Sequence, residues 1–289
     1  MVDKTTKVRE IQKKFNIIGR TEELRKIIVA ISVDKNILIE GEVGVGKTIL
    51  AQAVSSHYDS NFYRIDCSEE ILTHNLVGYF DPPLVINKGY IEDSYVYGPL
   101  VSAMINGGCL FINEINRMPE STQNVLLTAL DEKILEIPKL KTIHAKDNFF
   151  VIATLNPSST VGTTVLGEAL KDRFIWIKLD YQKPEEEIKI IKKEVNFDGE
   201  IDDKIAQLSQ EIIQATRNII SIRRGSSIRG AIDLAALITQ YDNNNSSKNW
   251  IEAAIMALYN KIELEDGVAK SKKEIITDIV LSVLNSSDF

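Results

Sequence analysis

The chain has 289 residues, which suits one large domain or two modest ones, and its 44% hydrophobic and 26% charged content is that of an ordinary soluble globular protein. The 34 Lys and Arg against 41 Asp and Glu give a net charge of -7, which disfavours non-specific nucleic-acid binding. Two cysteines argue against a disulfide framework, the three histidines show no metal-ligand spacing, and no apolar run approaches the ~18 residues that span a bilayer, so we expect a cytoplasmic protein without a membrane span.

The first 180 residues alternate short apolar strands with helical stretches. Helices are expected at 22–31, where Thr21 can act as the N-cap, and at 47–57. The expected strands are 36–40, 61–66, 109–113, 148–155 and 174–179. Because buried parallel strands read as continuous apolar runs separated by helices, we predict an α/β fold with a five-stranded parallel sheet covered on both faces.

Strand signals stop after Asp180, and helical spacing takes over. Further helices are expected at 184–195, 201–219, 226–240, 248–264 and 271–285. We therefore predict two domains, an α/β domain at residues 1–182 and a small all-α domain at residues 183–289.

A glycine-rich turn separates the first strand from the helix at 47–57. Its sequence, G-E-V-G-V-G-K-T, fits the phosphate-loop pattern, in which backbone N–H groups and the helix N-terminus face phosphate oxygens. A chance glycine turn is the alternative, but the strand before it and the helix after it favour a phosphate loop. Lys47 would reach the β- and γ-phosphates and Thr48 would place its hydroxyl on Mg²⁺. The candidate nucleotide-binding residues are Gly41, Glu42, Val43, Gly44, Val45, Gly46, Lys47, Thr48 and Ile49.

The strand at 109–113 ends on Asn113 and Glu114, where a nucleotide-hydrolysing protein is expected to deliver a carboxylate towards Mg²⁺. Asn113 offers the metal shell an amide oxygen without a negative charge, so Mg²⁺ should be held less strongly and Asn113→Asp should lower the Mg²⁺ requirement. Glu114 is the candidate base that orients and deprotonates the attacking water. The alternative is a solvated strand end. No guanine-reading Asn-Lys-x-Asp occurs, so ATP is favoured over GTP.

A series of stretches in this order resembles the AAA+ ATPases, and among them the MoxR group. I-I-G-R-T-E-E-L at 17–24 is similar to the segment that packs near the adenine, which implies a nucleotide contact for Ile18. F-I-N-E-I-N-R-M-P-E resembles Walker B, A-T-L-N-P at 153–157 sensor 1, L-G-E-A-L-K-D-R-F at 166–174 the arginine-finger segment, and G-S-S-I-R-G-A at 225–231 sensor 2. The resemblance covers residues 17 to about 240 and implies a P-loop NTPase fold followed by a helical lid.

The resemblance also implies catalytic roles. Asn156 would hydrogen-bond the attacking water or the γ-phosphate, Arg173 would reach into the neighbouring subunit's site, and Arg229 would touch the γ-phosphate from the lid. Each residue also has a structural alternative. Asn156 could be a turn residue before a proline, Arg173 could form a surface ion pair with Asp172 or Glu168, and Arg229 could be an arginine on a helix surface. Interface roles for Arg117, Arg223 and Arg224 stay open.

Two segments are similar to the substrate-contacting excursions of this clade. Residues 78–97 resemble the helix-2 insert and contain four tyrosines, two prolines and two glycines, as suits a projecting hairpin. Residues 133–147 resemble the hairpin before sensor 1. The alternative for both is an ordinary surface excursion.

Together these features predict an ATP- and Mg²⁺-dependent remodelling motor. The resemblance implies a homo-oligomeric ring, expected to be a hexamer, and a separate protein client or partner with a von Willebrand factor A domain. Two alternatives remain: a nucleotide-dependent switch or scaffold with little turnover, and a nucleic-acid motor. The acidic net charge counts against the last.

Overall fold

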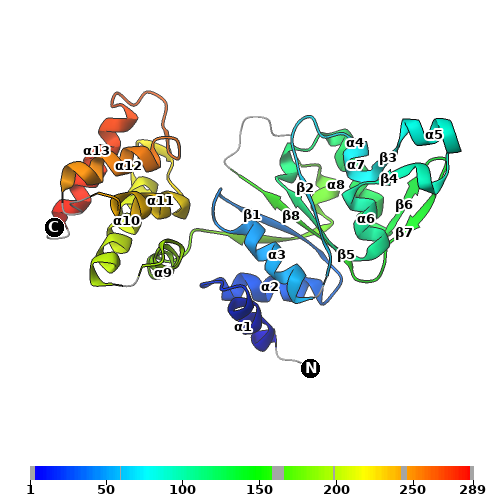
Figure 1. Cartoon of the computed structure of the whole chain (residues 1–289), viewed down its shortest axis with the longest axis horizontal. Helices are drawn as coiled ribbons and strands as arrows, with labels where there is room; N and C mark the ends of the chain where they lie inside the picture. The colour runs from blue at the N-terminus through cyan, green and yellow to red at the C-terminus, as the bar shows by residue number, and fades with distance from the viewer. Residues whose placement is uncertain (1–3, 59, 158–165, 198, 242–245, 287–289) are drawn as a thin grey trace. The chain divides into compact units, whose positions relative to one another are not determined.

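The computed structural model describes residues 4–58, 60–157, 166–197, 199–241 and 246–286. The chain divides into two compact units, the first formed by Met1–Glu42 with Gly46–Asp180 and the second by Val43–Val45 with Tyr181–Phe289 (Figure 1). The division along the chain falls between Asp180 and Tyr181, whereas the sequence placed it after residue 182. The two units are described separately below.

The first unit is built on a parallel sheet with the predicted five strands. In spatial order they are β2 (Phe62–Asp66), β5 (Gly108–Asn113), β8 (Phe149–Leu155), β1 (Asn36–Gly41) and β9 (Phe174–Leu179). Every neighbouring pair is parallel, with Asp66 opposite Asn113 and Ile39 opposite Thr154. The carboxyl ends of all five strands therefore meet at one edge of the sheet, which confirms the predicted fold class.

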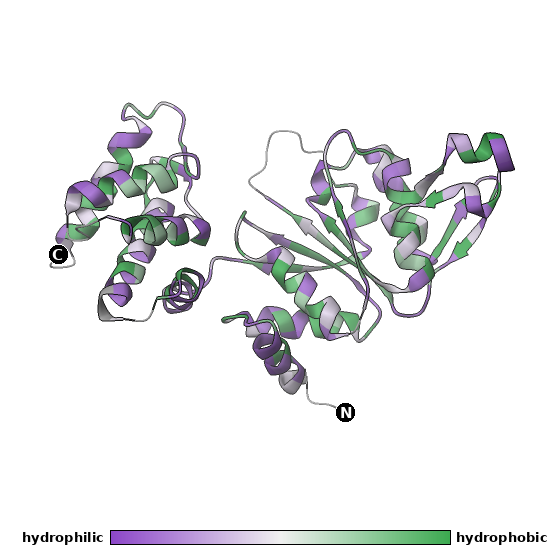
Figure 2. Ribbon diagram, viewed as in Figure 1, coloured by the Kyte–Doolittle hydropathy of each residue, from purple (hydrophilic) through white to green (hydrophobic). Residues whose placement is uncertain are grey.

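Helices lie on both faces of this sheet (Figure 2). The three inner strands, β5, β8 and β1, are buried along nearly their whole length, so they present apolar side chains to both sides. Leu38, Ile112 and Ala153 belong to the core shared with α6 and α7, whereas α2 and α3 pack on β1, β2, β5 and β9. A fully buried aliphatic side chain contributes about 1.5–3 kcal/mol. The helices of this unit are α1 (Lys4–Lys14), α2 (Thr21–Ile31), α3 (Lys47–His57), α4 (Thr73–Val77), α5 (Pro82–Lys88), α6 (Pro99–Asn106), α7 (Glu120–Asp131) and α8 (Glu168–Lys171), with short 3₁₀ turns η1 (Glu92–Ser94) and η2 (Ile115–Arg117).

The start of α2 differs from the expectation. Thr21 is the first helical residue rather than the N-cap, and Arg20 precedes it with φ 60°. The Thr21 hydroxyl accepts a hydrogen bond from Gln12 Nε2 at 3.0 Å, while the buried Arg20 pairs with Glu23 at 3.0 Å. A contact with α1 has replaced the cap.

The two predicted excursions are hairpins. β3 (Gly78–Phe80) pairs antiparallel with β4 (Tyr95–Tyr97), and α5 lies between them. β6 (Ile134–Ile137) pairs antiparallel with β7 (Lys141–His144). Both hairpins lie on the right-hand side of Figure 1 with α5.

The second unit packs five helices around its own core, with Trp250 fully buried. They are α9 (Pro184–Val195), α10 (Glu200–Asn218), α11 (Ile228–Ile238), α12 (Ser247–Leu258) and α13 (Lys272–Ser286). The helix expected at 248–264 ends at Leu258, because the chain then forms β11 (Glu263–Leu264), which pairs antiparallel with β10 (Ile222–Arg224). Within the described residues, none of the helices is both long enough and apolar enough to cross a lipid bilayer.

Candidate functional site

The glycine-rich turn lies between β1, which ends at Gly41, and α3, which begins at Lys47. Gly44 and Gly46 have φ of 84° and 95°, in the region that favours glycine. The Lys47 ammonium donates to the carbonyl oxygens of Gly41 and Glu42 at 2.5 and 2.9 Å. The loop therefore has the strand, helix and backbone twist that a phosphate cradle needs, with its lysine folded over it.

The remaining loop residues differ in exposure. Thr48, in the first turn of α3, is half-buried, and Ile49 is exposed. Ile18 lies in the connection between α1 and α2 and is half-buried, and the next carbonyl, that of Gly19, accepts from Gln12 Nε2 at 2.6 Å. The segment expected near the adenine is thus held in place by α1.

Glu114 follows the last residue of β5 in a left-handed conformation with φ 55°. That conformation is uncommon for a residue with a side chain, and a specific hydrogen bond holds it: the Glu114 N–H donates to Thr154 Oγ1 at 2.9 Å. The Glu114 side chain is 29% exposed, and its carboxylate meets the Arg117 guanidinium at 3.2 Å. The candidate base is therefore accessible to water while its backbone is fixed.

Asn113 makes two side-chain hydrogen bonds at the same edge. Its Oδ1 accepts from Thr154 Oγ1 at 3.0 Å, and its Nδ2 donates to Asp66 Oδ1 at 2.9 Å. Asp66, the last residue of β2, also accepts from Arg64 Nε and Nη2 at 2.8 and 2.6 Å. The sequence did not single out Asp66, because its closeness to Asn113 depends on β2 pairing with β5, and the order of the strands was not predicted.

Electrostatic effects at this edge follow from the same contacts. The hydrogen bond from Arg64 lowers the pKa of Asp66 below its ordinary value, and the one from Asn113 acts in the same direction. Burial raises the pKa of the neighbouring Cys67 thiol to about 12, with Asp66 and Glu114 adding to the effect. Asp66 is thus an ionised acceptor, and Cys67 is an unreactive buried thiol.

Asn156 comes directly after β8 and is buried, and its carbonyl accepts from Asn116 Nδ2 at 3.4 Å. Because β8 lies between β5 and β1, Asn156 is at the same edge as Glu114 and the glycine-rich loop. The first unit therefore brings together both ends of the loop, Gly41–Glu42 and Gly46–Lys47, with Asn113, Glu114 and Asn156.

Arg173 lies at the opposite end of the sheet, directly before the first residue of β9. Its guanidinium contacts Asp131 Oδ2 through Nε at 2.7 Å and Nη2 at 2.5 Å, and it also donates to the Ala169 carbonyl. The ion pair considered from the sequence, with Asp172 or Glu168, is thus replaced by one with α7. Arg173 is not part of the cluster around Glu114.

Three sequence-predicted arginines belong to the second unit. Arg229 is the second residue of α11. Arg224 pairs with Glu263 at 2.7 Å, and Arg223 contacts the same carboxylate at 3.5 Å, so both strengthen the β10–β11 pairing.

Mg²⁺ would find suitable donors at the carboxyl edge of the sheet. The Thr48 hydroxyl, the Asn113 amide oxygen and the Glu114 carboxylate are oxygen ligands of the kind Mg²⁺ prefers. Among the described residues no group of three or more His, Cys, Asp or Glu side chains could hold a metal ion. Mg²⁺ that is bound with nucleotide phosphates needs only one or two protein ligands, so the residues present fit that ion.

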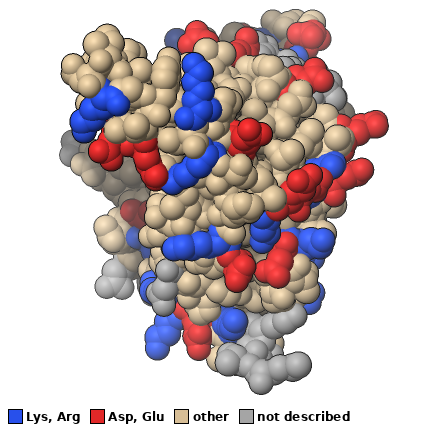
Figure 3. All heavy atoms as spheres, turned by 90° about the vertical axis from the view of Figure 1, so that its right-hand side faces the viewer, with Lys and Arg blue, Asp and Glu red and all other residues tan. Residues whose placement is uncertain are grey.

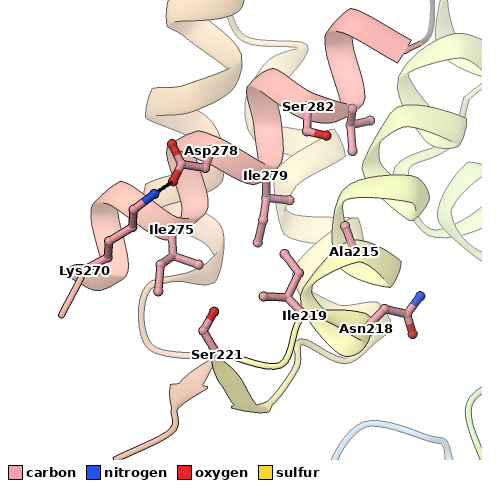
Figure 4. A pocket seen from close by; sticks show the side chains of 10 residues that line it. Ala215, Asn218, Ile219, Ser221, Lys270, Ile275, Asp278, Ile279 and Ser282 are labelled. Carbon is pink, nitrogen blue, oxygen red and sulfur yellow. Dashed lines mark hydrogen bonds and ion pairs between the residues drawn. The ribbon is translucent and has the colours of Figure 1, made fainter. Parts of the chain in front are cut away.

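Two pockets lie away from this edge. One, of about 600 Å³, is lined by both hairpins, including Phe80, Tyr90, Tyr95, Ile137 and Lys139. The other, of about 530 Å³, belongs to the second unit. Figure 4 shows its apolar side chains from α10 and α13 and, at one side, the ion pair between Lys270 and Asp278 at 2.7 Å. No sequence-predicted site residue lines either pocket.

Known proteins resemble the chain over this region. The family model for an AAA domain of the dynein-related subfamily matches residues 36–174, from the start of β1 to the start of β9. The uncharacterised protein YojN of Bacillus subtilis is 34% identical over 213 residues, which are 73% of this chain and 69% of YojN. An uncharacterised protein of Staphylococcus aureus strain USA300 is 32% identical over 241 residues, 80% of this chain and 91% of that protein.

Solved structures share the fold. A crystal structure from Cytophaga hutchinsonii, named as a candidate ATPase, is 22% identical with a TM-score of 0.51, covering 96% of this chain and 94% of its own. The RuvB Holliday junction branch migration motor of Thermotoga maritima is 18% identical with a TM-score of 0.52, covering 93% and 70%. At these identities the likeness shows the fold alone.

Proposed function

Because the chain belongs to the AAA+ family, with an AAA domain of the dynein-related subfamily, we propose that it is an Mg²⁺-dependent ATPase that remodels a protein partner. One observation supports this most: the glycine-rich loop, the carboxylate of Glu114 and the buried Asn156 share the carboxyl edge of the parallel sheet. Ligands bind at that edge in open α/β sheets.

Each group at this edge has a proposed task. The loop backbone would bind the phosphates, and Lys47 would turn from the Gly41 and Glu42 carbonyls to the β- and γ-phosphates. Thr48 and Asn113 would hold the metal. Mg²⁺, when bound, would neutralise the charge that develops on the phosphate oxygens. Glu114 orients the attacking water and accepts its proton, and Asn156 positions that water or the γ-phosphate.

Arg173 supports an oligomeric ring. It lies at the amino end of β9, whereas the loop lies at the carboxyl edge, so within the first unit it stands at the wrong end of the sheet to serve its own loop. An arginine finger supplied by a neighbouring subunit solves this geometry. We infer a homo-oligomeric ring, expected to be a hexamer, in which Asp131 holds the guanidinium of Arg173. Arg229 would contact the γ-phosphate from the helical lid.

The two hairpins are the proposed contact with the partner. Their shared pocket is lined by aromatic and aliphatic side chains, and Lys139 lies 4.3 Å from the centre of the Tyr90 ring. Such a surface suits an apolar or aromatic protein segment better than a phosphate backbone. On the face that carries the hairpins, basic and acidic side chains are interspersed (Figure 3). We propose a separate protein client, of the von Willebrand factor A type that the MoxR resemblance implies.

A second candidate is a nucleotide-dependent switch with little turnover. The 3.2 Å ion pair between Arg117 and Glu114 favours it, because the guanidinium occupies a carboxylate that would otherwise orient the attacking water. Ring assembly that draws Arg117 to a neighbouring subunit would release Glu114, so the switch and the motor differ in whether turnover rises with protein concentration.

A mixing experiment tests the motor. Glu114→Gln lacks the base but keeps its arginine finger, and Arg173→Ala lacks the finger but keeps its base. Each variant alone should turn over ATP at least ~100-fold more slowly than the unmodified chain. Mixed one to one, they should regain activity, because some interfaces then pair an intact base with an intact finger. If mixtures are no more active than the separate variants, the shared-site ring is wrong.

A further inference from the structure

A chain of three hydrogen bonds links Asp66 to Glu114 through Asn113 and Thr154. The chemistry of the two end groups fixes which atom donates in each bond. The Asp66 carboxylate, paired with Arg64, offers only acceptors, so the Asn113 atom 2.9 Å away must be Nδ2. At the other end the Glu114 N–H can only donate, so the Thr154 hydroxyl accepts it and gives its own proton to Asn113 Oδ1.

Residue 113 must therefore donate on the β2 side and accept on the β8 side. An asparagine does both, whereas an ionised aspartate can only accept. Aspartate at this position would set two carboxylate oxygens against each other across the 2.9 Å gap that a proton now bridges. The fully buried Thr154 hydroxyl would then donate to a charged carboxylate in place of a neutral amide.

This chain of bonds joins the sheet edge to the candidate base. Thr154 is fully buried, so water does not compete for its hydroxyl. Its two hydrogen bonds therefore fix the orientation of the Asn113 amide and the position of the Glu114 backbone. The Asn113 oxygen faces β8, the strand that separates β5 from β1 and its glycine-rich loop. The orientation of the Asn113 amide is thus controlled by Asp66 at the end of β2, on the side of β5 away from β8.

We propose that Asp66 is a positioning residue of the ATPase site: acting through the Asn113 amide and the Thr154 hydroxyl, it fixes the backbone of Glu114 and keeps the Asn113 oxygen turned towards the nucleotide side. The inference rests on the proposed function for its consequence, but the bonding itself is independent of ATP. It reverses the expectation from the sequence that Asn113→Asp would strengthen Mg²⁺ binding.

The first test uses the chain without nucleotide or Mg²⁺. Asn113→Asp should lower the thermal midpoint by at least about 3 °C. Asp66→Asn should lower the thermal midpoint less than Asn113→Asp does, since the amide oxygen of the new asparagine can still accept from Asn113. Combining Asp66→Asn with Asn113→Asp should recover most of the loss of Asn113→Asp, because the new amide at position 66 would donate to the new carboxylate at position 113.

A matched control separates this effect from added negative charge. Asn75 in α4 is exposed and accepts from the Leu72 N–H at 2.9 Å through Oδ1, so an aspartate there keeps its bond. Asn75→Asp should leave the midpoint within about 1 °C. A double variant no more stable than Asn113→Asp, or an Asn113→Asp chain as stable as Asn75→Asp, would overturn the proposal.

The second test concerns the site. Asn113→Asp should lower kcat at least ~10-fold while nucleotide affinity measured without Mg²⁺ changes less than ~2-fold, and the double variant should regain most of kcat. A higher kcat and tighter Mg²⁺-dependent nucleotide binding in Asn113→Asp would contradict the positioning role. If the unmodified chain has no ATPase activity, the proposed function fails, while the thermal comparison still decides the bonding.

Discussion

Arg217 in α10 makes the most heavily buried ion pair among the described residues of the second unit. Its Nη1 contacts both oxygens of Glu187 at 3.0 Å, with the two side chains only 11% and 2% exposed. Its Nε donates to the Ser226 carbonyl at 2.8 Å, and its guanidinium lies 3.8 Å from the centre of the Tyr181 ring. It thus joins the start of the unit to the loop before α11, the helix that carries Arg229.

Arg217→Met should destabilise the second unit by about 3–5 kcal/mol. The larger part comes from leaving the Glu187 carboxylate buried without its cation, with only Gln210 Nε2 at 3.3 Å as a partner. The lost bond to Ser226 adds about 1 kcal/mol. Replacing both partners, Glu187→Leu with Arg217→Met, removes the unpaired charge, so the double variant should lose only about 1–2 kcal/mol.

Urea unfolding followed by Trp250 fluorescence measures this loss. Trp250 is fully buried in the second unit, and the other tryptophan, Trp176 in the first unit, is 57% exposed, so a Trp176→Phe background leaves one reporter. With a denaturant slope of about 2 kcal/mol per molar, Arg217→Met should lower the midpoint by about 2 M. A shift below about 0.5 M, or a double variant as unstable as the single one, would refute the reasoning.

Two other predictions address the partner class and the buried thiol. Turnover should not rise when single- or double-stranded DNA is added at low salt, given the net charge of -7; DNA stimulation that weakens with salt would favour the nucleic-acid alternative. Burial raises the pKa of Cys67 from 9.0 to about 12, so above pH 9 the unfolded chain releases a proton that the folded chain keeps, and the free energy of unfolding should fall by up to about 1.4 kcal/mol per pH unit from this group. Cys67→Ala should therefore lose less stability between pH 8.5 and 10.5 than the unmodified chain in urea titrations, and an equal loss in both would show that this thiol does not titrate as described.

The five strands of the sheet could be predicted because each is a short apolar run bounded by polar or glycine residues. The glycine-rich turn was equally clear, since its pattern fixes both the strand before it and the helix after it. Local pattern was a poorer guide where tertiary contacts compete with it. Thr21 has cap chemistry, yet its hydroxyl is engaged by Gln12.

The order of the strands in the sheet could not be predicted from the sequence, and that order determines the partners of Asn113. From the sequence alone, Asn113 was interpreted as an uncharged residue at a position where an aspartate is expected. In the sheet it is the link between Asp66, 47 residues earlier, and Thr154, 41 residues later. The partner of Arg173 was missed for the same reason, because Asp131 lies on α7, 42 residues away along the chain.

The central claim is that this chain hydrolyses ATP with Glu114 as its base. The most direct test is phosphate release from ATP with Mg²⁺, over a range of protein concentrations, for the unmodified chain and for Glu114→Gln. The account predicts turnover that requires Mg²⁺, rises more steeply than protein concentration as rings form, and falls at least ~100-fold in Glu114→Gln while ATP still binds. Equal phosphate release by the two chains would contradict it.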